Sequence, residues 1–550
     1  MNRLVRGIVA ASFSAAIASC SGGDGPGPGG GAGGSGGSPA VAELKVTPLH
    51  LVLAVRQQKK IEVVARDALG EPVEVPIFFR TADPEIALVG DDGTVTGRAK
   101  GQTRIEIEAA RLGAVVAVAV EGEPAHIDAP ESIAVAMGRS FPLDVSVQDA
   151  DGDEVTSIEV EWTSEDPQIA VVEGGEVVAR GWGETRLVAA AGEVEAFVRV
   201  RTLLRFREIG TGEFHTCGLT PVGTVYCWGL ASEGQLGFAA QQINYDAPTL
   251  PVDGGMPFVE LAVGADHACA LDEMGRAHCW GRNDAGQLGT EELLYAERPR
   301  MVPGLVGLRS IAAQGDHTCA LDEGGFARCW GGPVGPQPRA VNGGPFVELA
   351  VGAFHACGRT EEGAVFCWGD NDRGQLARPA PEFSADPLEV EGIPALAAIA
   401  SGHHHVCGIA AENSRLYCWG ANERGQLGRG EVGERGEPAP LLEGIPVEFV
   451  GLGPATSCAV SSAGAYCWGA NDTAQSGSQR SEEILDAPTR VVSGPWSFAR
   501  IRPGARHTCA LTEQNEAYCW GDASAGQLGV PSCDPETKIC PYPENVVGQR

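Results

Sequence analysis

Short apolar stretches separated by Gly-rich turns recur through the second half of the chain at a step of about 50 residues. In one repeat, residues 269–272 and 276–279 read as two strands, and Glu273-Met274-Gly275 reads as a three-residue loop with Gly where a left-handed residue is needed. A small sheet of this kind buries its faces only against its neighbours. The fixed period therefore predicts a propeller or solenoid array.

Each repeat carries a cysteine that is followed 9 to 11 residues later by Cys-Trp-Gly. The first cysteines of successive repeats are 52, 50, 38, 50, 51 and 51 residues apart. The short step follows the third repeat, where Gly331-Gly332-Pro333 replaces the Gly-Gln-Leu-Gly segment of other repeats. We expect that repeat to have lost a long loop.

The two cysteines of a repeat face each other across the predicted hairpin, within reach of a disulfide. The alternative is that they are free, buried, small hydrophobic residues. Of the 17 cysteines, 14 fall into seven hairpin pairs and Cys533 and Cys540 form an eighth candidate pair, which leaves only Cys20. The predicted disulfides are Cys217–Cys227, Cys269–Cys279, Cys319–Cys329, Cys357–Cys367, Cys407–Cys418, Cys458–Cys467, Cys509–Cys519 and Cys533–Cys540.

The N-terminus predicts export, which such disulfides require. Two arginines precede an apolar stretch at residues 7–17 that is too short for a membrane span, and Ile17-Ala18-Ser19-Cys20 resembles a bacterial lipobox. Residues 1–20 are then a lipoprotein signal peptide with Cys20 as the lipidated cysteine, and Ser21 is compatible with the outer membrane. The alternative is an ordinary secretory signal. Residues 21–40, almost entirely Gly, Ser and Pro, predict a flexible tether.

Two stretches of short alternating strands, residues 41–122 and 123–204, are weak repeats of each other. Residues 79–87 correspond to 162–170, with an Asp-Pro turn before Ile-Ala, and residues 93–101 correspond to 175–183. These segments resemble the group 2 bacterial Ig-like domains. The resemblance and the strand spacing imply two β-sandwiches that act as spacers.

The repeats at residues 205–550 present His-x-Cys-x-Leu, then Cys-Trp-Gly, then Gly-Gln-Leu-Gly. In this they resemble the regulator of chromosome condensation family, which implies a seven-bladed β-propeller. The fourth repeat departs at Ala377, and the sixth has Ala474-Gln475-Ser476-Gly477 and no His. The expected fold class is all-β, with two Ig-like β-sandwiches followed by a seven-bladed β-propeller.

Most repeats are followed by a Pro, a Val or Leu, and a Gly, and the chain ends on one more such segment, Pro543 to Gly548. The first repeat has none before it. We therefore expect the terminal segment to complete the first blade and close the ring.

Six of the seven repeats have a histidine two residues before the first cysteine, and this recurrence around the ring favours a structural role over one active site. The run His403-His404-His405 and the acidic turn at residues 149–154 invite metal binding, but alternate strand residues face opposite sides and the turn reads as a hairpin. No nucleophile elbow, phosphate loop or zinc-protease motif is present in the sequence. We predict no catalytic residue, no metal and no cofactor.

The formal net charge of -32, from 72 acidic and 40 basic residues, disfavours nucleic acid as a partner. Recognition is expected in the variable connections between blades, several of which carry an aromatic or aliphatic residue. The alternative is that these side chains only anchor long loops. The predicted binding residues are Tyr245, Tyr295, Phe383, Ile484 and Leu485.

The sequence therefore predicts an exported, lipid-anchored, non-catalytic binding or adhesion protein at the outer membrane or cell surface. Its partner is an unknown protein or glycan, and acyl chains are its membrane contact. The alternatives are a polysaccharide lyase or hydrolase that uses the propeller funnel, and a purely structural envelope component.

Overall fold

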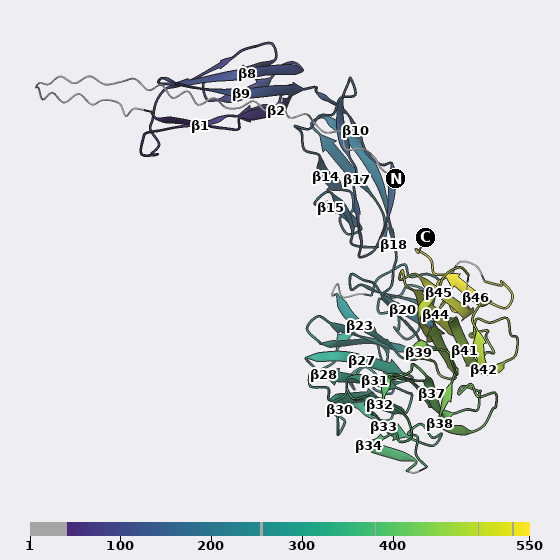
Figure 1. Cartoon of the computed structure of the whole chain (residues 1–550). Coiled ribbons are helices and arrows are strands. Elements are labelled where there is room, and N and C mark those ends of the chain that lie inside the picture. The colour runs from purple at the N-terminus through teal and green to yellow at the C-terminus, as the bar shows by residue number, and fades with distance from the viewer. Residues whose placement is uncertain (1–40, 253–256, 380, 493, 531–532, 550) are drawn as a thin grey trace, which may run out of the picture. The chain divides into compact units, whose positions relative to one another are not determined.

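The computed structural model describes residues 41–252, 257–379, 381–492, 494–530 and 533–549 (Figure 1). Every regular element in these ranges is a β-strand, which confirms the all-β prediction. The described residues form no helix of the length and hydropathy that a membrane crossing needs. The predicted signal peptide, Cys20 and the predicted tether lie outside the described residues.

The first compact unit ends at Glu123. Its sheets have the strand orders β2-β9-β8-β5, β3-β7-β6 and β1-β4. Side chains that alternate along the strands, including Leu53, Ile105 and Val116, are fully buried between the sheets. The strands are β1 (Glu43–Thr47), β2 (His50–Ala54), β3 (Gln58–Lys60), β4 (Glu62–Arg66), β5 (Ile77–Thr81), β6 (Ala87–Val89), β7 (Thr94–Gly97), β8 (Gly101–Ala109) and β9 (Leu112–Glu121).

The second unit begins at Pro124, and its first nine strands repeat this connectivity. The sheet orders are β11-β18-β17-β14, β12-β16-β15 and β10-β13, and β11 pairs with β18 in parallel as β2 does with β9. The strands are β10 (Pro124–Asp128), β11 (Ser132–Ala136), β12 (Ser140–Pro142), β13 (Ser146–Asp149), β14 (Glu161–Ser164), β15 (Ala170–Glu173), β16 (Glu176–Ala179), β17 (Gly183–Ala191) and β18 (Val194–Leu203).

The acidic segment at residues 149–154 is a turn stabilised by its own carboxylate. The backbone N–H groups of Asp151 and Asp153 donate to Asp149 Oδ1, both at 3.0 Å. In the first unit, Leu69 and Glu71 donate in the same way to Asp67 Oδ1. The equivalence of the two turns follows from the internal repeat, and side-chain-to-backbone bonds of this kind are typical of Asx turns.

The rest of the second unit consists of seven four-stranded sheets in chain order, called here propeller sheets 1 to 7 (Figure 1). Each is built from four consecutive strands.

The strands of sheets 1 to 4 are β19 (Glu208–Thr211), β20 (His215–Leu219), β21 (Val225–Leu230), β22 (Asn244–Tyr245), β23 (Phe258–Val263), β24 (His267–Asp272), β25 (Ala277–Arg282), β26 (Tyr295–Met301), β27 (Leu308–Gln314), β28 (His317–Asp322), β29 (Ala327–Gly331), β30 (Gly335–Ala340), β31 (Glu348–Val351), β32 (His355–Arg359), β33 (Val365–Asp370) and β34 (Phe383–Glu389). The strands of sheets 5 to 7 are β35 (Leu396–Ser401), β36 (His405–Ala410), β37 (Leu416–Ala421), β38 (Arg435–Leu441), β39 (Val447–Leu452), β40 (Thr456–Ser461), β41 (Gly464–Ala470), β42 (Ile484–Arg490), β43 (Phe498–Pro503), β44 (His507–Thr512), β45 (Ala517–Asp522) and β46 (Ile539–Asn545).

The first strands of successive sheets contact one another, and β43 of the last sheet contacts β19 of the first. Apolar side chains fill the interfaces between neighbouring propeller sheets, which are called seams below. Trp280 of sheet 2, for example, lies in one buried cluster with Leu236 and Cys217 of sheet 1. This arrangement explains why each sheet depends on its neighbours.

The prediction that the C-terminal segment completes the first sheet is wrong. Strand β46 pairs with β45 and is the outer strand of sheet 7. In other repeats the proline of this segment lies in the outer strand of the same repeat, as Pro299 does in β26 and Pro387 in β34. In the first repeat Pro251 forms a bridge with Tyr226 of β21, so this repeat has its own outer segment. Sheets 1 and 7 meet instead through β19, which contacts β43 and β44.

Candidate functional site

Seven of the predicted cysteine pairs lie at facing positions of the second and third strands of a propeller sheet. All seven are disulfides, with Cα atoms 4.0–4.1 Å apart, and Cys533–Cys540 is the eighth, with Cα atoms 4.9 Å apart. The eight predicted pairs are therefore present in the structure. So many disulfides indicate an oxidising environment.

The recurring histidines connect neighbouring sheets. The Nε2 atoms of His267 and His405 lie 2.8 and 2.9 Å from the hydroxyl oxygens of Thr318 and Ser457 in the next sheet. His507 Nε2 lies 2.7 Å from Thr216 Oγ1, which joins sheet 7 to sheet 1. Burial lowers the pKa of His267, His405 and His507 to about 3, so all three are neutral at physiological pH.

The sequence of the next sheet decides whether a histidine has this partner. In the sheets that follow His215 and His355, the residues equivalent to Thr318 are Ala268 and Val406, which have no hydroxyl. The Nε2 atoms of both histidines accordingly have no hydrogen-bond partner among the described residues. His317 is instead 3.2 Å from the carbonyl of Gly352 through Nδ1. The recurring histidines thus have a structural role at the seams between sheets.

The hydroxyls and the Cys-Trp-Gly tryptophans share one set of acceptors, the backbone carbonyls of the Gly-Gln-Leu-Gly segments. Thr216 donates to the carbonyl of Gln527 at 2.8 Å, and Ser457 donates to that of Gln426 at 2.8 Å. Five tryptophans donate through Nε1 to the carbonyl of the glutamine of a preceding sheet, at 2.9–3.1 Å: Trp280, Trp330, Trp419, Trp468 and Trp520.

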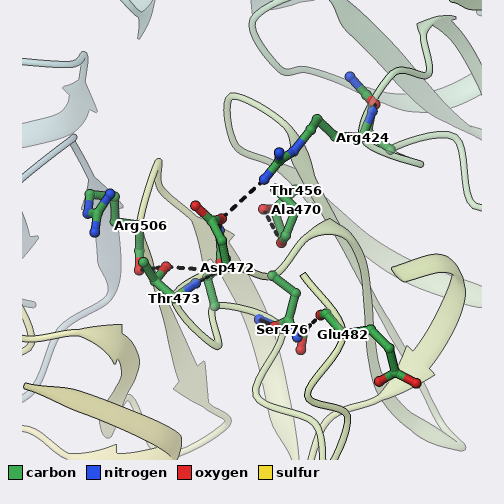
Figure 2. A network of polar contacts seen from close by, with 11 residues as sticks. Arg424, Thr456, Ala470, Asp472, Thr473, Ser476, Glu482 and Arg506 are labelled. Carbon is green, nitrogen blue, oxygen red and sulfur yellow. Dashed lines mark hydrogen bonds and ion pairs between the residues drawn. The ribbon is translucent and has the colours of Figure 1, made fainter. Parts of the chain in front are cut away.

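Sheet 6, which has no histidine at this position, is connected by other polar groups (Figure 2). Thr456 replaces the histidine and donates to the carbonyl of Ala470 within the same sheet at 3.0 Å. The hydroxyl of Thr473 donates to the carbonyl of Arg506 in sheet 7 at 2.7 Å, and Arg424 of sheet 5 forms an ion pair with Asp472 at 3.4 Å.

The three histidines of the run 403–405 have three different surroundings. His405 belongs to the seam, while His403 lines a cavity of about 110 Å³ together with Glu213 and Gln314. The ring of His404 stacks on Phe354, with centroids 5.7 Å apart.

His404 also belongs to a cluster that the sequence analysis missed. Its ligand atoms and those of Asp370 and Asp372 lie within 4.8 Å of one another, and burial raises the pKa of Asp370. The sequence feature that could have revealed this cluster is the Asp-Asn-Asp at residues 370–372, directly after the fourth Cys-Trp-Gly.

The first strands of the sheets line a central cavity of about 370 Å³. Opposite the first cysteine of each sheet the cavity strand carries a small residue in sheets 1 to 6, whereas sheet 7 carries Arg502. The Cζ atom of Arg502 lies 4.8 Å from the centroid of the Phe449 ring. Burial lowers the pKa of Arg502, and the charges of Glu208 and Glu348 partly oppose this effect. The small residues are Gly210, Ala262, Ala312, Ala350, Ala400 and Gly451.

Two carboxylates of this cavity accept hydrogen bonds from the first strand of the next sheet. Leu261 N donates to Glu208 Oε2 at 3.1 Å, and Ile311 N and Ser310 Oγ donate to Glu260 Oε1 at 3.2 and 2.9 Å. Burial raises the pKa of Glu208, and it raises the pKa of Glu260 to about 7. A carboxyl that titrates there has the acidity of a general acid or base.

Of the five predicted binding residues, two are buried and three are at least partly exposed. Tyr245 and Leu485 are 7% and 6% exposed and belong to the core, where Tyr245 packs edge-on against Phe238. Their prediction as surface contacts is wrong, because both anchor their loops. Tyr295 and Phe383 are 48% and 57% exposed, and Ile484 is partly exposed. These three open the outer strands of sheets 2, 4 and 6, so they are spread around the rim.

Two models of the "Regulator of chromosome condensation (RCC1) repeat" match this part of the chain. One matches residues 206–235, 258–287, 346–375, 397–426 and 504–527, and the other matches 222–271, 274–321, 362–409 and 413–460. The Ultraviolet-B receptor UVR8 of Arabidopsis thaliana is 28% identical over 350 residues, which make up 62% of this chain and 71% of the receptor.

The probable E3 ubiquitin-protein ligase HERC4 of Homo sapiens is 29% identical over 234 residues, which make up 42% of this chain and only 19% of the ligase. Among solved structures, Prp20p from Saccharomyces cerevisiae, which binds Gsp1p and histones, aligns with a TM-score of 0.53 at 25% identity. The alignment covers 60% of this chain and 87% of that chain. These matches confirm the resemblance of the repeats: the matched segments are similar to regulator of chromosome condensation repeats, and the propeller sheets share the β-propeller fold of Prp20p.

Proposed function

We propose that this protein is an exported, lipid-anchored, non-catalytic binding protein that presents a disulfide-stabilised propeller to a protein partner. In this proposal Cys20 carries the lipid, residues 21–40 are the tether, and residues 41–122 and 123–204 are Ig-like spacers. Residues 205–550 form a closed propeller in which the seven sheets are the blades. The disulfides and the closed series of contacts between first strands support it.

The observation that carries the proposal is how the side chains of the propeller are used. The recurring residues are buried: the cysteines and tryptophans of all seven sheets and the histidines of six. The cysteines form disulfides within each sheet, and most of the histidines and tryptophans form hydrogen bonds, as His267 and Trp280 do with neighbouring sheets. The exposed apolar side chains, such as Tyr295 and Phe383, occur at irregular rim positions. Exposed aromatic residues are characteristic of protein-contact surfaces. The binding of Prp20p to other proteins supports a protein partner, and the net charge of -32 disfavours nucleic acid.

The test is affinity capture with the mature, oxidised protein from a detergent-solubilised envelope fraction of the source organism. The wild type is compared with the double variant Tyr295→Ser/Phe383→Ser and with Leu69→Ser, a matched control at an 88% exposed position in the first unit. We expect one protein to be enriched by the wild type and by the control, and to be lost from the double variant. Recovery of the same proteins by all three would contradict the proposal.

The central cavity favours a second candidate function, a polysaccharide lyase or hydrolase, because the pKa of Glu260 is raised to about 7 there. The hydrogen bonds that Glu260 accepts from Ile311 N and Ser310 Oγ favour a structural role instead. Assays of polysaccharide cleavage with the wild type and Glu260→Gln distinguish the two, since the amide retains the acceptor oxygen and loses the titrating proton. Cleavage by the wild type that the variant abolishes would establish the enzyme.

A further inference from the structure

The seam between propeller sheets 3 and 4 lacks a segment that other seams possess. In most sheets the Cys-Trp-Gly is followed by the Gly-Gln-Leu-Gly segment or a close variant of it. The first residue of this segment lies against the outer strand of the next sheet. A Cβ atom added to Gly234 would be 2.7 Å from the carbonyl oxygen of Ala296, and one added to Gly425 would be 2.9 Å from Cα of Asp486. In sheet 3 this segment is replaced by Gly331-Gly332-Pro333. The start of strand β34 is therefore left without this cover.

The missing segment also removes an acceptor. In five other sheets the tryptophan donates to the glutamine carbonyl of the preceding sheet, as Trp330 does to Gln287 at 3.0 Å. Trp368 is 5% exposed, and its Nε1 has no hydrogen-bond partner among the described residues. A buried N–H without an acceptor costs roughly 1–3 kcal/mol.

Trp228 also has no partner for Nε1 among the described residues, but its seam is filled. The segment Gly526-Gln527-Leu528-Gly529 is present there, and a Cβ atom added to Gly529 would lie 2.7 Å from Trp228 Nε1. The combination of an unpaired indole and a missing segment is found at Trp368.

A cavity of about 200 Å³ occupies this position. Its walls include Val334, Val341, Phe354, Trp368, Phe383 and Ser384. Phe354 and Phe383 are 46% and 57% exposed, so the cavity has an aromatic entrance. Its volume is below the roughly 300–1,000 Å³ typical of sites for drug-sized ligands, which suits one or two amino-acid residues.

We propose that this cavity binds a short turn of a partner protein that replaces the missing segment. On binding, the groups that cover Trp368 Nε1 in the free protein move aside, a backbone carbonyl of the partner accepts its hydrogen bond, and a leucine-sized side chain enters between Val334 and Phe383. The filled seams show the same recognition inside the molecule, where a glutamine carbonyl meets the indole and the adjacent Leu288 or Leu427 is buried. The inference rests on the proposed binding function and assigns it a site.

The probe is the blocked peptide Ala-Gly-Gln-Leu-Gly, which copies residues 285–289 of sheet 2. It is titrated into the mature full-length protein by isothermal calorimetry, and the indole N–H signals are followed by NMR on protein labelled with ¹⁵N-tryptophan. We expect saturable binding of one peptide per chain with a Kd of about 1 mM or tighter. Replacement of the peptide's leucine by alanine weakens it at least five-fold.

Two variants of the protein separate the donor from the fold. Trp368→Phe removes an N–H that has no partner, so no hydrogen bond is lost and relief of the unpaired N–H offsets the smaller ring's lost packing; we expect a melting temperature no lower than that of the wild type and peptide binding weakened at least ten-fold. Trp280→Phe removes an N–H that donates to Gln235, so it lowers the melting temperature and leaves the affinity for the peptide unchanged. A third variant replaces Gly332-Pro333 with residues 283–289 of sheet 2, which fills the cavity and abolishes binding.

Absence of binding at several millimolar peptide overturns the inference, as does an affinity that Trp368→Phe leaves unchanged. Either result leaves the proposed function intact if affinity capture still recovers a partner that depends on Tyr295 and Phe383. Loss of that capture together with retained peptide binding would overturn the proposed function alone.

Discussion

His507 Nε2 and Thr216 Oγ1 lie 2.7 Å apart although 291 residues separate them in the chain. Thr216 donates its only hydroxyl hydrogen to the carbonyl of Gln527, so the hydrogen between His507 and Thr216 belongs to the imidazole. We predict that Thr216→Val lowers the free energy of unfolding by about 1–3 kcal/mol, because the imidazole N–H and the Gln527 carbonyl both lose their partner.

Chemical denaturation of the oxidised protein measures this effect. Thr489→Val is the control, because the Thr489 hydroxyl bonds a carbonyl on the exposed side of sheet 6. Equal midpoints for wild type, control and Thr216→Val would show that the bond does not support the junction of sheets 1 and 7.

The hydroxyl can also be added at a seam where the sequence has none. Val406 occupies this position beyond His355, whose Nε2 has no partner among the described residues, and the Gln375 carbonyl already accepts from Trp419 nearby. Threonine has almost the shape of valine, so Val406→Thr supplies an acceptor for His355 without a cavity. We predict a gain in the free energy of unfolding of about 0.5–1.5 kcal/mol.

Val406→Ala provides the comparison, since it changes the packing without adding a hydroxyl. A Val406→Thr protein that is less stable than the wild type would contradict the assigned role of the hydroxyl.

The buried histidines predict that acid destabilises the propeller. Burial lowers the pKa of His267, His405 and His507 from 6.5 to about 3. Between these values the unfolded chain binds more protons than the folded protein, so the stability is fully present above pH 6.5 and is lost as the pH falls towards 3. Urea midpoints measured from pH 8 to pH 4 test this.

Replacing His507 by glutamine serves as the matched variant, since an amide can donate to Thr216 but does not titrate in this range. We expect a shallower loss of stability below pH 6.5 in His507→Gln than in the wild type. Superimposable pH profiles would contradict the account.

The disulfides predict that the mature protein contains no reactive thiol. Alkylation of the denatured, unreduced protein followed by mass spectrometry is expected to leave the sixteen paired cysteines unlabelled and to find Cys20 acylated. Labelling of hairpin cysteines such as Cys269 and Cys279 in protein isolated without reductant would contradict the proposed export.

Much of the propeller could be predicted from the sequence because its units are local. Cys269 and Cys279 pair within one hairpin, so their spacing alone determines that they face each other. The recurrence of His267 and Trp280 likewise indicated structural roles. The location of the terminal strand was mispredicted, because segments like the one at Pro543 follow most repeats and the sequence alone does not tell to which of its two neighbouring repeats such a segment belongs.

The candidate sites were harder to predict because they depend on contacts between sheets. Tyr245 and Phe383 both lie in variable connections, yet Tyr245 is buried against Phe238 while Phe383 is 57% exposed and lines the cavity between sheets 3 and 4. The loss of the Gly-Gln-Leu-Gly segment in the third repeat was visible in the sequence. Its consequence at Trp368 follows only once the other seams show what that segment does.

The central claim is that recurring residues hold the propeller together and irregular rim residues bind the partner. The most direct measurement determines thermal stability and affinity capture on the same preparations of Phe383→Ser and Thr216→Val. We predict that Phe383→Ser loses the captured protein while its melting temperature stays within about 1 °C of the wild type, and that Thr216→Val melts a few degrees lower and retains the captured protein. Loss of capture in Thr216→Val at a temperature where it is folded, with normal capture by Phe383→Ser, would contradict the claim.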